Sequence, residues 1–332
     1  MIAQLKNLIL KILRQILAQV GGVLLSTKVY GGLLSQRALA VHQLTQINSL
    51  NLEPGLTGLI FSKDRALQLY SLLFTYFKLV KNPAPLFVIY NASTGDHEKS
   101  YLEIAQALNE ISIPVILVKE QKSFRETLLQ VLDRIKTKNI FCLVDDIIFI
   151  RSVDLALAAK INPLESILSL RHSPHLRRSY TANAEQAPPN FRPSTRHPIL
   201  LEFNWFEKGH EWSDPWSVDG QILATAELKS LSQICQFKAP NTYEGELKSF
   251  NDLCRNRLGL CYSESKILNL PINRIQNEVL NRSGNISPEV LLQHWNLGEM
   301  LNTQQFNQHI PQSPHEEHLI NFCSRQKIEL SI

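Results

Sequence analysis

Paired cysteines are missing from this sequence. Its five cysteines are scattered along the chain, with no CxxC pair and no spacing that suits a metal ion. Such a set is typical of reduced thiols, so it argues against a disulfide-stabilised secreted domain and predicts a cytoplasmic location. Cys142 falls inside an apolar run, where the most economical explanation is packing.

Acidic residues are absent before Glu53, although that stretch carries several lysines and arginines. Over residues 1–20 the polar positions recur at helical spacing, and Leu, Ile and Val fill most of the rest. Three charges there argue against a membrane-spanning helix, and no charged segment precedes a clean apolar core as in a signal peptide. Two interpretations stay open: a helix on an anionic membrane surface, at the inner face, or an amphipathic helix packed on the domain. Gly21-Gly22 and Gly31-Gly32 predict breaks after it.

Internal repeats and low-complexity linkers are absent as well. The apolar content of 44% and charged content of 19% are those of a globular protein, and 332 residues suffice for a large core. A net charge of +4 is too small to indicate nucleic-acid binding. Residues 172–198 are rich in arginine but hold only two aromatic residues among them, Tyr180 and Phe191, so we expect no nucleic-acid partner.

Strand and helix patterns alternate from residue 56 to residue 144. This alternation predicts parallel strands with right-handed crossovers, in a sheet covered on both faces. Ser123 and Glu126 form a capping-box pattern before one helix. The predicted strands are 56–61, 86–90, 114–118 and 140–144, with 167–171 and 202–206 as further candidates. The predicted helices are 66–79, 98–111, 124–135, 221–228 and 246–258. We expect a helical segment over 1–50, a main domain over 51–305 and a helical tail over 306–332.

The fourth predicted strand ends in two adjacent carboxylates, Asp145 and Asp146. Carboxylates at the carboxyl end of a buried strand lie where α/β sheets bind ligands. Hard oxygen ligands suit Mg²⁺ or Mn²⁺ holding a diphosphate, although Asp-Asp pairs also cap helices and turns. Because the pair lies at a sheet edge, we expect its replacement to leave the fold largely intact.

The acidic pair belongs to an ordered set of short segments: 61–69, 143–147, 169–171, 216–220, 241–245 and 271–276. Together they resemble bacterial glycosyltransferases of the GT-A type, with the nucleotide-diphospho-sugar transferase fold, of the kind that makes surface and capsular polysaccharides. The resemblance covers about residues 56–301. The chain departs from the pattern in reading Asp-Asp-Ile instead of Asp-x-Asp. It also lacks a Gln-x-x-Arg-Trp signature, which argues against processive synthesis.

The resemblance implies an α/β GT-A fold with a mostly parallel central sheet flanked by helices. It implies a hexosyltransferase-like enzyme that moves a sugar from a nucleotide-diphosphate donor, foremost a UDP-sugar, to a glycan or lipid-linked acceptor. The cofactor would be Mn²⁺ or Mg²⁺, held by Asp145 and Asp146. We predict a donor site made of Ser62, Lys63, Asp64, Arg65, Asn91, Ser93, Asp145 and Arg171.

Asp219 is the first candidate for the general base that takes the proton of the acceptor hydroxyl. A partly shielded carboxylate can have a suitably raised pKa. The alternative is that Asp219 caps a helix. Glu244 is the rival base. His172, His175 and His210 lack zinc spacing, and His315 with His318 indicates a solvated helix face.

Two other functions remain open. A nucleotidyltransferase has a similar sheet, but it normally carries a glycine-rich loop after the first strand, and residues 62–65 contain no glycine. A non-catalytic, flavodoxin-like nucleotide-binding module would leave Asp219 and residues 172–198 without a role.

Overall fold

The computed structural model describes residues 9–13, 17, 25–273 and 284–330. The chain divides into two compact units, Met1–Leu44 and Thr45–Ile332, and each is described by itself. Among the described helices, none combines the length and the apolar character needed to cross a membrane.

The bounds of the elements follow. The α-helices are α2 (Thr27–Ser49), α3 (Ala66–Leu79), α4 (Gly95–Ala107), α5 (Phe124–Arg134), α6 (Leu155–Ala158), α7 (Thr225–Ile234), α8 (Pro240–Lys248) and α9 (Pro288–Asn296). The 3-10 helices are η1 (His210–Ser213), η2 (Asn251–Cys254) and η3 (Thr303–Phe306). The strands are β1 (Glu53–Lys63), β2 (Val80–Lys81), β3 (Leu86–Asn91), β4 (Val115–Lys119), β5 (Thr137–Val144), β6 (Ile147–Phe149), β7 (Val153–Asp154), β8 (Ser166–Ser169), β9 (Arg178–Ser179), β10 (Ala184–Glu185), β11 (Arg192–Pro193), β12 (Leu201–Asn204), β13 (Ile222–Ala224), β14 (Leu258–Cys261), β15 (Ile267–Asn269), β16 (Glu299–Leu301) and β17 (Phe322–Ser324).

Most of the described part of the smaller unit is helix α2, which continues past the unit boundary. The helix runs through Gly31 and Gly32, so the predicted break at this pair is wrong. Glycine costs about 1 kcal/mol in a helix and does not by itself end one. The amphipathic helix predicted for residues 1–20 lies mostly outside the described residues, as does Gly21-Gly22.

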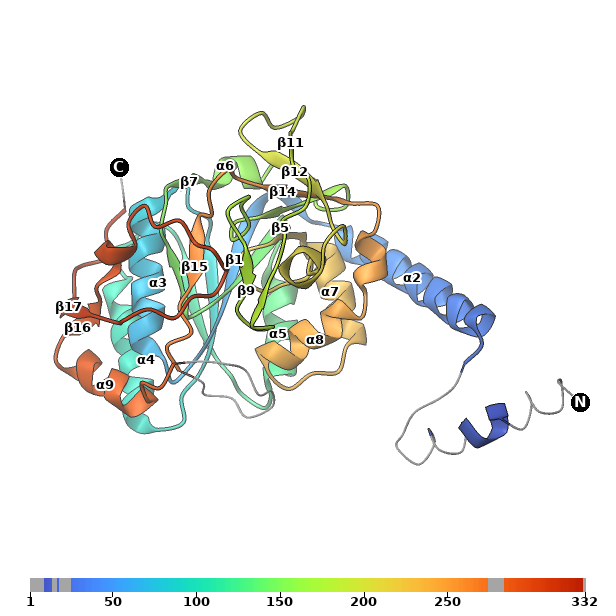
Figure 1. Ribbon diagram of the computed structural model, residues 1–332. Helices are drawn as coiled ribbons and strands as arrows, with labels where there is room; N and C mark the ends of the chain where they lie inside the picture. The colour runs from blue at the N-terminus through green and yellow to red at the C-terminus, as the bar shows by residue number, and fades with distance from the viewer. Residues whose placement is uncertain (1–8, 14–16, 18–24, 274–283, 331–332) are drawn as a thin grey trace, which may run out of the picture. The chain divides into compact units, whose positions relative to one another are not determined.

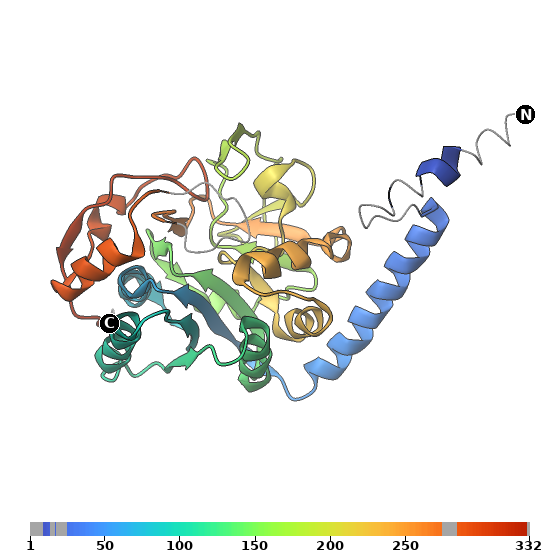
Figure 2. The same cartoon turned by 90° about the horizontal axis from the view of Figure 1, so that it is seen from below.

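A five-stranded sheet in the order β13-β5-β1-β3-β4 forms the centre of the larger unit (Figures 1 and 2). β1, β3, β4 and β5 are parallel, and β13 pairs antiparallel with β5 at one edge. The interior of β1 is buried on both faces, as its unbroken apolar run predicts. The predicted fold class, an α/β protein with a mostly parallel central sheet flanked by helices, is confirmed.

Helices cover both faces of this sheet (Figure 2). α3 packs beside α4, whereas α5 packs beside α7. Nearly every residue of α3 is buried, because β6, β16 and α9 cover the helix on the side away from the sheet. Ser123 caps the start of α5, and its hydroxyl accepts a hydrogen bond from the backbone N–H of Glu126 at 3.2 Å. This is the predicted cap.

A second, four-stranded sheet in the order β11-β12-β14-β8 lies beyond β5 in the chain. Its β8 and β14 are parallel, while its other pairs are antiparallel. An isolated bridge joins Ser169, at the end of β8, to Gln221, just before β13. The antiparallel pairing of β13 with β5, continued by the hydrogen bond from the N–H of Gly220 to the carbonyl of Cys142, places the turn around residue 219 near the carboxyl end of β5.

Three predictions for the second half are wrong. Residues 221–228 begin as the edge strand β13 and become helical only at Thr225. Residues 246–258 hold the end of α8, a 3-10 turn and the start of β14. Residues 306–330 contain strand β17 and no α-helix, so the helical tail is absent from the described part of 306–332. Backbone pairing with distant strands outweighs weak local helix propensity here.

Candidate functional site

The described residues enclose a cavity of about 540 Å³ at the carboxyl ends of β1 and β5. Strands β3 and β4 lie on one side of β1, and β5 lies on the other, so the direction of strand addition reverses between β1 and β5. Ligands of open α/β sheets bind at such a switch point. The predicted site residues that line the cavity are Ser62, Lys63, Arg65, Asn91, Asp145, Asp146, Arg171, Asp219 and Glu244.

Arg65 holds the two predicted metal ligands together. Its Nη1 donates to Asp145 Oδ1 at 3.0 Å and to Asp146 Oδ1 at 2.6 Å. Its Nη2 donates to the carbonyl of Asn273 at 2.5 Å, and the backbone N–H of Lys63 donates to Asp145 Oδ2 at 3.2 Å. The side chains of Asp145 and Asp146 are 4% and 12% exposed. The pair therefore lies at the end of β5, as predicted, with a guanidinium in contact with both carboxylates.

Burial sets the charge state of this cluster. It raises the pKa of Asp146 to about 8, because desolvation and the neighbouring Asp145 outweigh the attraction of Arg65. Burial lowers the pKa of Arg65, but Asp145 and Asp146 raise it by more. The pKa therefore lies above its ordinary value, and the guanidinium stays charged. Replacing both aspartates by Ala would leave that buried charge without its carboxylate partners, which typically costs several kcal/mol. We therefore now expect such a variant to lose stability as well as donor binding.

The turn after β1 separates the predicted donor-binding residues into two groups. Ser62, Lys63 and Arg65 line the cavity. Asp64 has a left-handed backbone, with φ of 51°, and its Oδ1 accepts the N–H of Ser93 at 2.7 Å. Neither Asp64 nor Ser93 lines the cavity, so the structure does not support the prediction that they contact the donor. They join the turns after β1 and β3 to each other instead.

A second buried arginine, Arg171, lies across the cavity. Its Nη1 is 3.4 Å from Asp219 Oδ2, and its Nη2 is 3.2 Å from Glu211 Oε2 and 3.8 Å from Asp214 Oδ2. Burial lowers the pKa of Arg171, and the surrounding carboxylates raise it above the ordinary value. The predicted phosphate contact of Arg171 must therefore compete with three carboxylates that already surround it.

Asp219 is paired with a histidine that the sequence analysis placed on a solvated helix face. His315 Nε2 lies 3.2 Å from Asp219 Oδ2, and the two side chains are 16% and 10% exposed. The segment carrying His315 runs along β15, where the N–H of Asn269 donates to the carbonyl of Pro314 and the N–H of Glu316 donates to the carbonyl of Asn269. No local pattern could have revealed this pairing, because it joins distant parts of the chain.

The electrostatics of Asp219 also differ from the prediction. Burial raises its pKa, but the hydrogen bond and charge of His315, together with Arg171, bring it below the ordinary value. Burial lowers the pKa of His315, and Asp219 raises it above the ordinary value. The expected raised pKa of Asp219 is therefore wrong. Asp219 precedes β13 and not a helix, so the capping alternative is wrong as well.

Glu244, the rival base, lies on α8 and reaches back toward the turn before Asp219. Its Oε1 accepts the N–H of Val218 at 3.3 Å, and its Oε2 is 3.9 Å from Lys248 Nζ. Lys248 Nζ also lies 3.1 Å from Asp214 Oδ2. Burial and the nearby Glu244 raise the pKa of Asp214 to about 7, against Lys248 and Arg171. Glu211, Asp214, Lys238, Lys248 and His315 were not predicted from the sequence.

Acidic side chains outnumber basic ones in the described lining of the cavity. Seven aspartates and glutamates line it, against five lysines and arginines and one histidine. The raised pKa values of Asp146 and Asp214 leave these two carboxyls largely or partly protonated near neutral pH, so the charges of the lining nearly balance, and a divalent cation at the acidic pair would favour the ionised form of Asp146. Two adjacent carboxylates match the oxygen ligands that Mg²⁺ and Mn²⁺ prefer, so the residues present fit the predicted metal.

Comparisons with known proteins give only distant likenesses. The chain matches no protein-family model and no curated protein. Among solved structures it is similar to a mannosyltransferase from Pyrobaculum calidifontis in complex with GDP-Man and Mn²⁺, with 15% identity and a TM-score of 0.28 over 41% of this chain. The match spans 46% of the mannosyltransferase, less than half of its length.

It is also similar to 4-diphosphocytidyl-2C-methyl-D-erythritol synthase from Anaerococcus prevotii, with 9% identity and a TM-score of 0.36. That match covers 64% of this chain and 88% of the synthase. At these values neither likeness assigns a family or a function, and what this chain does must be argued from its own cavity.

Proposed function

We propose that the cavity binds a nucleoside-diphosphate sugar together with Mn²⁺ or Mg²⁺ and transfers the sugar to a hydroxyl of a glycan or lipid-linked acceptor. One observation carries the proposal. The adjacent carboxylates of Asp145 and Asp146 lie at the switch point of a parallel sheet, in a cavity whose described lining has an excess of acids. A divalent cation held by these carboxylates would neutralise the charge that grows on a diphosphate leaving group.

Basic groups near the acidic pair supply phosphate contacts. Lys63 lies at the end of β1, and Lys238 lies two residues before the start of α8. The amino-terminal end of α8, at Pro240 and Asn241, also lines the cavity, and helix amino termini attract phosphate. Asn91 and Ser62 lie at the ends of β3 and β1, where they can hydrogen-bond the base or ribose of the donor.

The pair of Asp219 and His315 accepts the proton of the acceptor hydroxyl. Asp219 fixes the imidazole through Nε2, and Nδ1 of His315 has no hydrogen-bond partner among the described residues. A buried nitrogen without a partner, on a ring oriented by a carboxylate, is arranged to take up a proton. Asp219 thus acts with His315, and Glu244 remains the rival.

Residues 1–20 attach the enzyme to the inner face of an anionic membrane in this proposal. The support is their helical spacing of apolar residues and the absence of acids before Glu53. A lipid-linked acceptor would then lie near the cavity-bearing unit.

Donor binding is tested by thermal shift with UDP, GDP, ADP and TDP, each with and without Mn²⁺ or Mg²⁺. We expect at least one diphosphate to stabilise the protein only when the cation is present. Asp146→Asn keeps the Asp145–Arg65 pair and should weaken the cation-dependent shift. Asp252→Asn, at a more exposed position, is the matched control and should leave the shift unchanged.

Two outcomes would overturn the proposal. The first is that no diphosphate binds with either cation. The second is release of pyrophosphate from a nucleoside triphosphate and a sugar phosphate, without sugar transfer from any diphosphate sugar. This second result would establish the nucleotidyltransferase alternative.

A further inference from the structure

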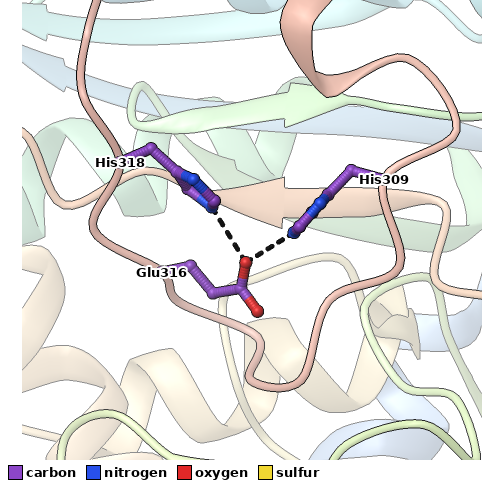
Figure 3. Close-up of side chains that lie close together, drawn as sticks. All are labelled: His309, Glu316 and His318. Atoms are coloured by element: carbon purple, nitrogen blue, oxygen red, sulfur yellow. Dashed lines mark hydrogen bonds and ion pairs between the residues drawn. The ribbon is translucent and has the colours of Figure 1, made fainter.

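Two histidines converge on one carboxylate oxygen in the segment between η3 and β17 (Figure 3). His309 Nε2 lies 2.6 Å from Glu316 Oε2, and His318 Nε2 lies 2.9 Å from the same oxygen. The three ligand atoms lie within 4.8 Å of one another. None of these residues lines the large cavity, so the cluster is separate from the acidic pair of the proposed donor site.

The carboxylate is fixed by the backbone around it. Its other oxygen, Oε1, accepts the N–H of Gln312 at 2.6 Å and the N–H of Ser313 at 3.3 Å. These bonds leave Oε2 directed at the two imidazoles. Hydrogen bonds of this kind orient metal ligands before the ion arrives.

The histidines are also held in place. The ring of His318 packs edge-on against Phe306, with centroids 5.1 Å apart, and stands perpendicular to the ring of His309 at the same distance. Arg151 donates from Nη2 to the carbonyl of Gln308 at 2.6 Å and from Nη1 to the carbonyl of His309. A residue of the β6–β7 connection therefore anchors the start of the segment.

Partial burial leaves the cluster open to solvent. The side chains of His309, Glu316 and His318 are 30%, 16% and 29% exposed. A metal ion there would have three protein ligands and room for water. Two imidazoles and one carboxylate suit Zn²⁺ and similar ions, whereas Mg²⁺ prefers oxygen ligands alone.

We propose that His309, Glu316 and His318 bind one Zn²⁺-type transition-metal ion. A simple ion pair needs only one histidine, as between His294 and Glu299, whose Nδ1 and Oε2 are 2.5 Å apart. Here two imidazole nitrogens and one carboxylate oxygen come together within 4.8 Å, so that three ligand atoms are near enough to share one ion.

The position of the cluster gives the ion a structural role. His315 and Glu317 alternate with the ligands Glu316 and His318 along the chain. His315 contacts Asp219, and Glu317 Oε1 accepts a hydrogen bond from Tyr180 Oη at 2.5 Å. A metal ion that fixes Glu316 and His318 would therefore hold in place the segment that positions His315 in the lining of the cavity. The binding of the ion does not depend on the proposed sugar transfer.

Metal binding is tested on the full chain after removal of bound metal with a chelator. Zn²⁺ is titrated in competition with a chromophoric chelator, and metal content is measured after dialysis. We expect about one equivalent for the wild type. Affinity should fall by more than about tenfold in His309→Ala and in His318→Ala, since even the loss of a group supporting a ligand can cost 10-fold to 100-fold. His294→Ala, which removes the histidine of the simple ion pair, should bind Zn²⁺ like the wild type.

Spectroscopy of the wild type guards against variants that fail to fold. Co²⁺ in place of Zn²⁺ should give visible absorption bands that Zn²⁺ abolishes by displacement. Absence of these bands, or a Zn²⁺ affinity that survives in both histidine variants, would overturn the site. Loss of Zn²⁺ binding in Asp146→Asn alone would move the ion to the acidic pair and would equally overturn it.

Discussion

Two arginines, the partly buried Arg65 and the buried Arg171, organise the cavity at the scale of single residues. Arg65 joins Asp145 to Asp146, and Arg171 lies among carboxylates that include Asp219. Buried ion pairs need each partner, because removal of one leaves an uncompensated charge in a medium that solvates it poorly. Each carboxylate of the cavity therefore supports the fold as well as the chemistry, and activity measurements on its variants need a stability measurement beside them.

The first prediction at this scale concerns Asp219 and His315, the pair proposed to accept the proton of the acceptor hydroxyl. Asp219→Asn removes the charge that orients His315, and His315→Gln removes the imidazole. Each should lower the rate of sugar transfer by about 10²–10⁴, the usual contribution of a positioned base. Donor affinity should barely change, because Asp145, Asp146 and the phosphate contacts remain. Steady-state kinetics and melting temperatures are to be measured together.

Glu244→Gln is the matched comparison for that pair. We expect it to transfer sugar at a nearly normal rate. If Glu244→Gln is inactive while Asp219→Asn and His315→Gln are active, Glu244 is the base and the assignment to the pair fails.

Asp214 gives a prediction about pH. Its pKa is raised from the ordinary value near 4 to about 7 by burial and by Glu244, against Lys248 and Arg171. Between these values the folded protein binds more protons at this residue than the unfolded chain does, so its contribution makes the free energy of unfolding fall as pH rises from about 4 to about 7. Asp214→Asn should remove that part of the fall. Urea unfolding at several pH values measures it, and an unchanged slope relative to the wild type would contradict the prediction.

Secondary structure could be predicted well for the four parallel strands of the central sheet, which lie in the first half of the chain. β1, β3, β4 and β5 are apolar runs between clear turns, and α3 has the predicted bounds. The second half could be predicted only in part: the candidate strands 167–171 and 202–206 correspond to β8 and β12, whereas β13 and the start of β14 were predicted as parts of helices. β13 and β14 are short and pair with strands distant in sequence, so their identity depends on the fold already formed.

The same distinction applies to the candidate site. Rules for strand ends brought Lys63, Arg65, Asp145 and Asp146 to one cavity. They failed for Asp64, because a left-handed backbone directs its carboxylate to Ser93. They could not find His315, since its place beside Asp219 depends on backbone pairing between its segment and β15.

The prediction at the scale of secondary-structure elements concerns Gly220. It connects Asp219 to β13 with a φ of +85°, and a Cβ there would lie 2.4 Å from Cδ1 of Ile267. Gly220→Ala should reduce the free energy of unfolding by about 1–3 kcal/mol through backbone strain and crowding, and it should slow transfer by shifting Asp219. Denaturant unfolding and kinetics test both effects.

Gly209→Ala is the control for this substitution. A Cβ at Gly209 meets nothing within 4 Å, so we expect a stability close to that of the wild type or slightly above it. Equal stability of the Gly220 and Gly209 variants would show that the connection tolerates a side chain.

The whole molecule combines a basic amino-terminal stretch with a compact unit over Thr45–Ile332. Several basic residues add up in their attraction to a membrane surface of negative charge, and salt screens this attraction. The two units therefore allow separate tests of attachment and of donor binding.

Deletion of residues 1–20 gives the prediction at this scale. The full chain should sediment with vesicles that contain anionic lipid, less so at high salt and little with neutral vesicles. The shortened chain should stay in solution and bind the donor as before. Equal sedimentation of both proteins with anionic vesicles would refute attachment through residues 1–20.

The distance along the chain between Phe61 and His315, both in the lining of the cavity, affects the protein during its synthesis. A chain emerging from the ribosome can begin to assemble the central strands long before residue 315 has been translated. Until then the cavity lacks the imidazole beside Asp219. Nascent chains that end before residue 315 would thus hold the central sheet without the complete site, so the proposed transfer would have to wait until that residue has been added.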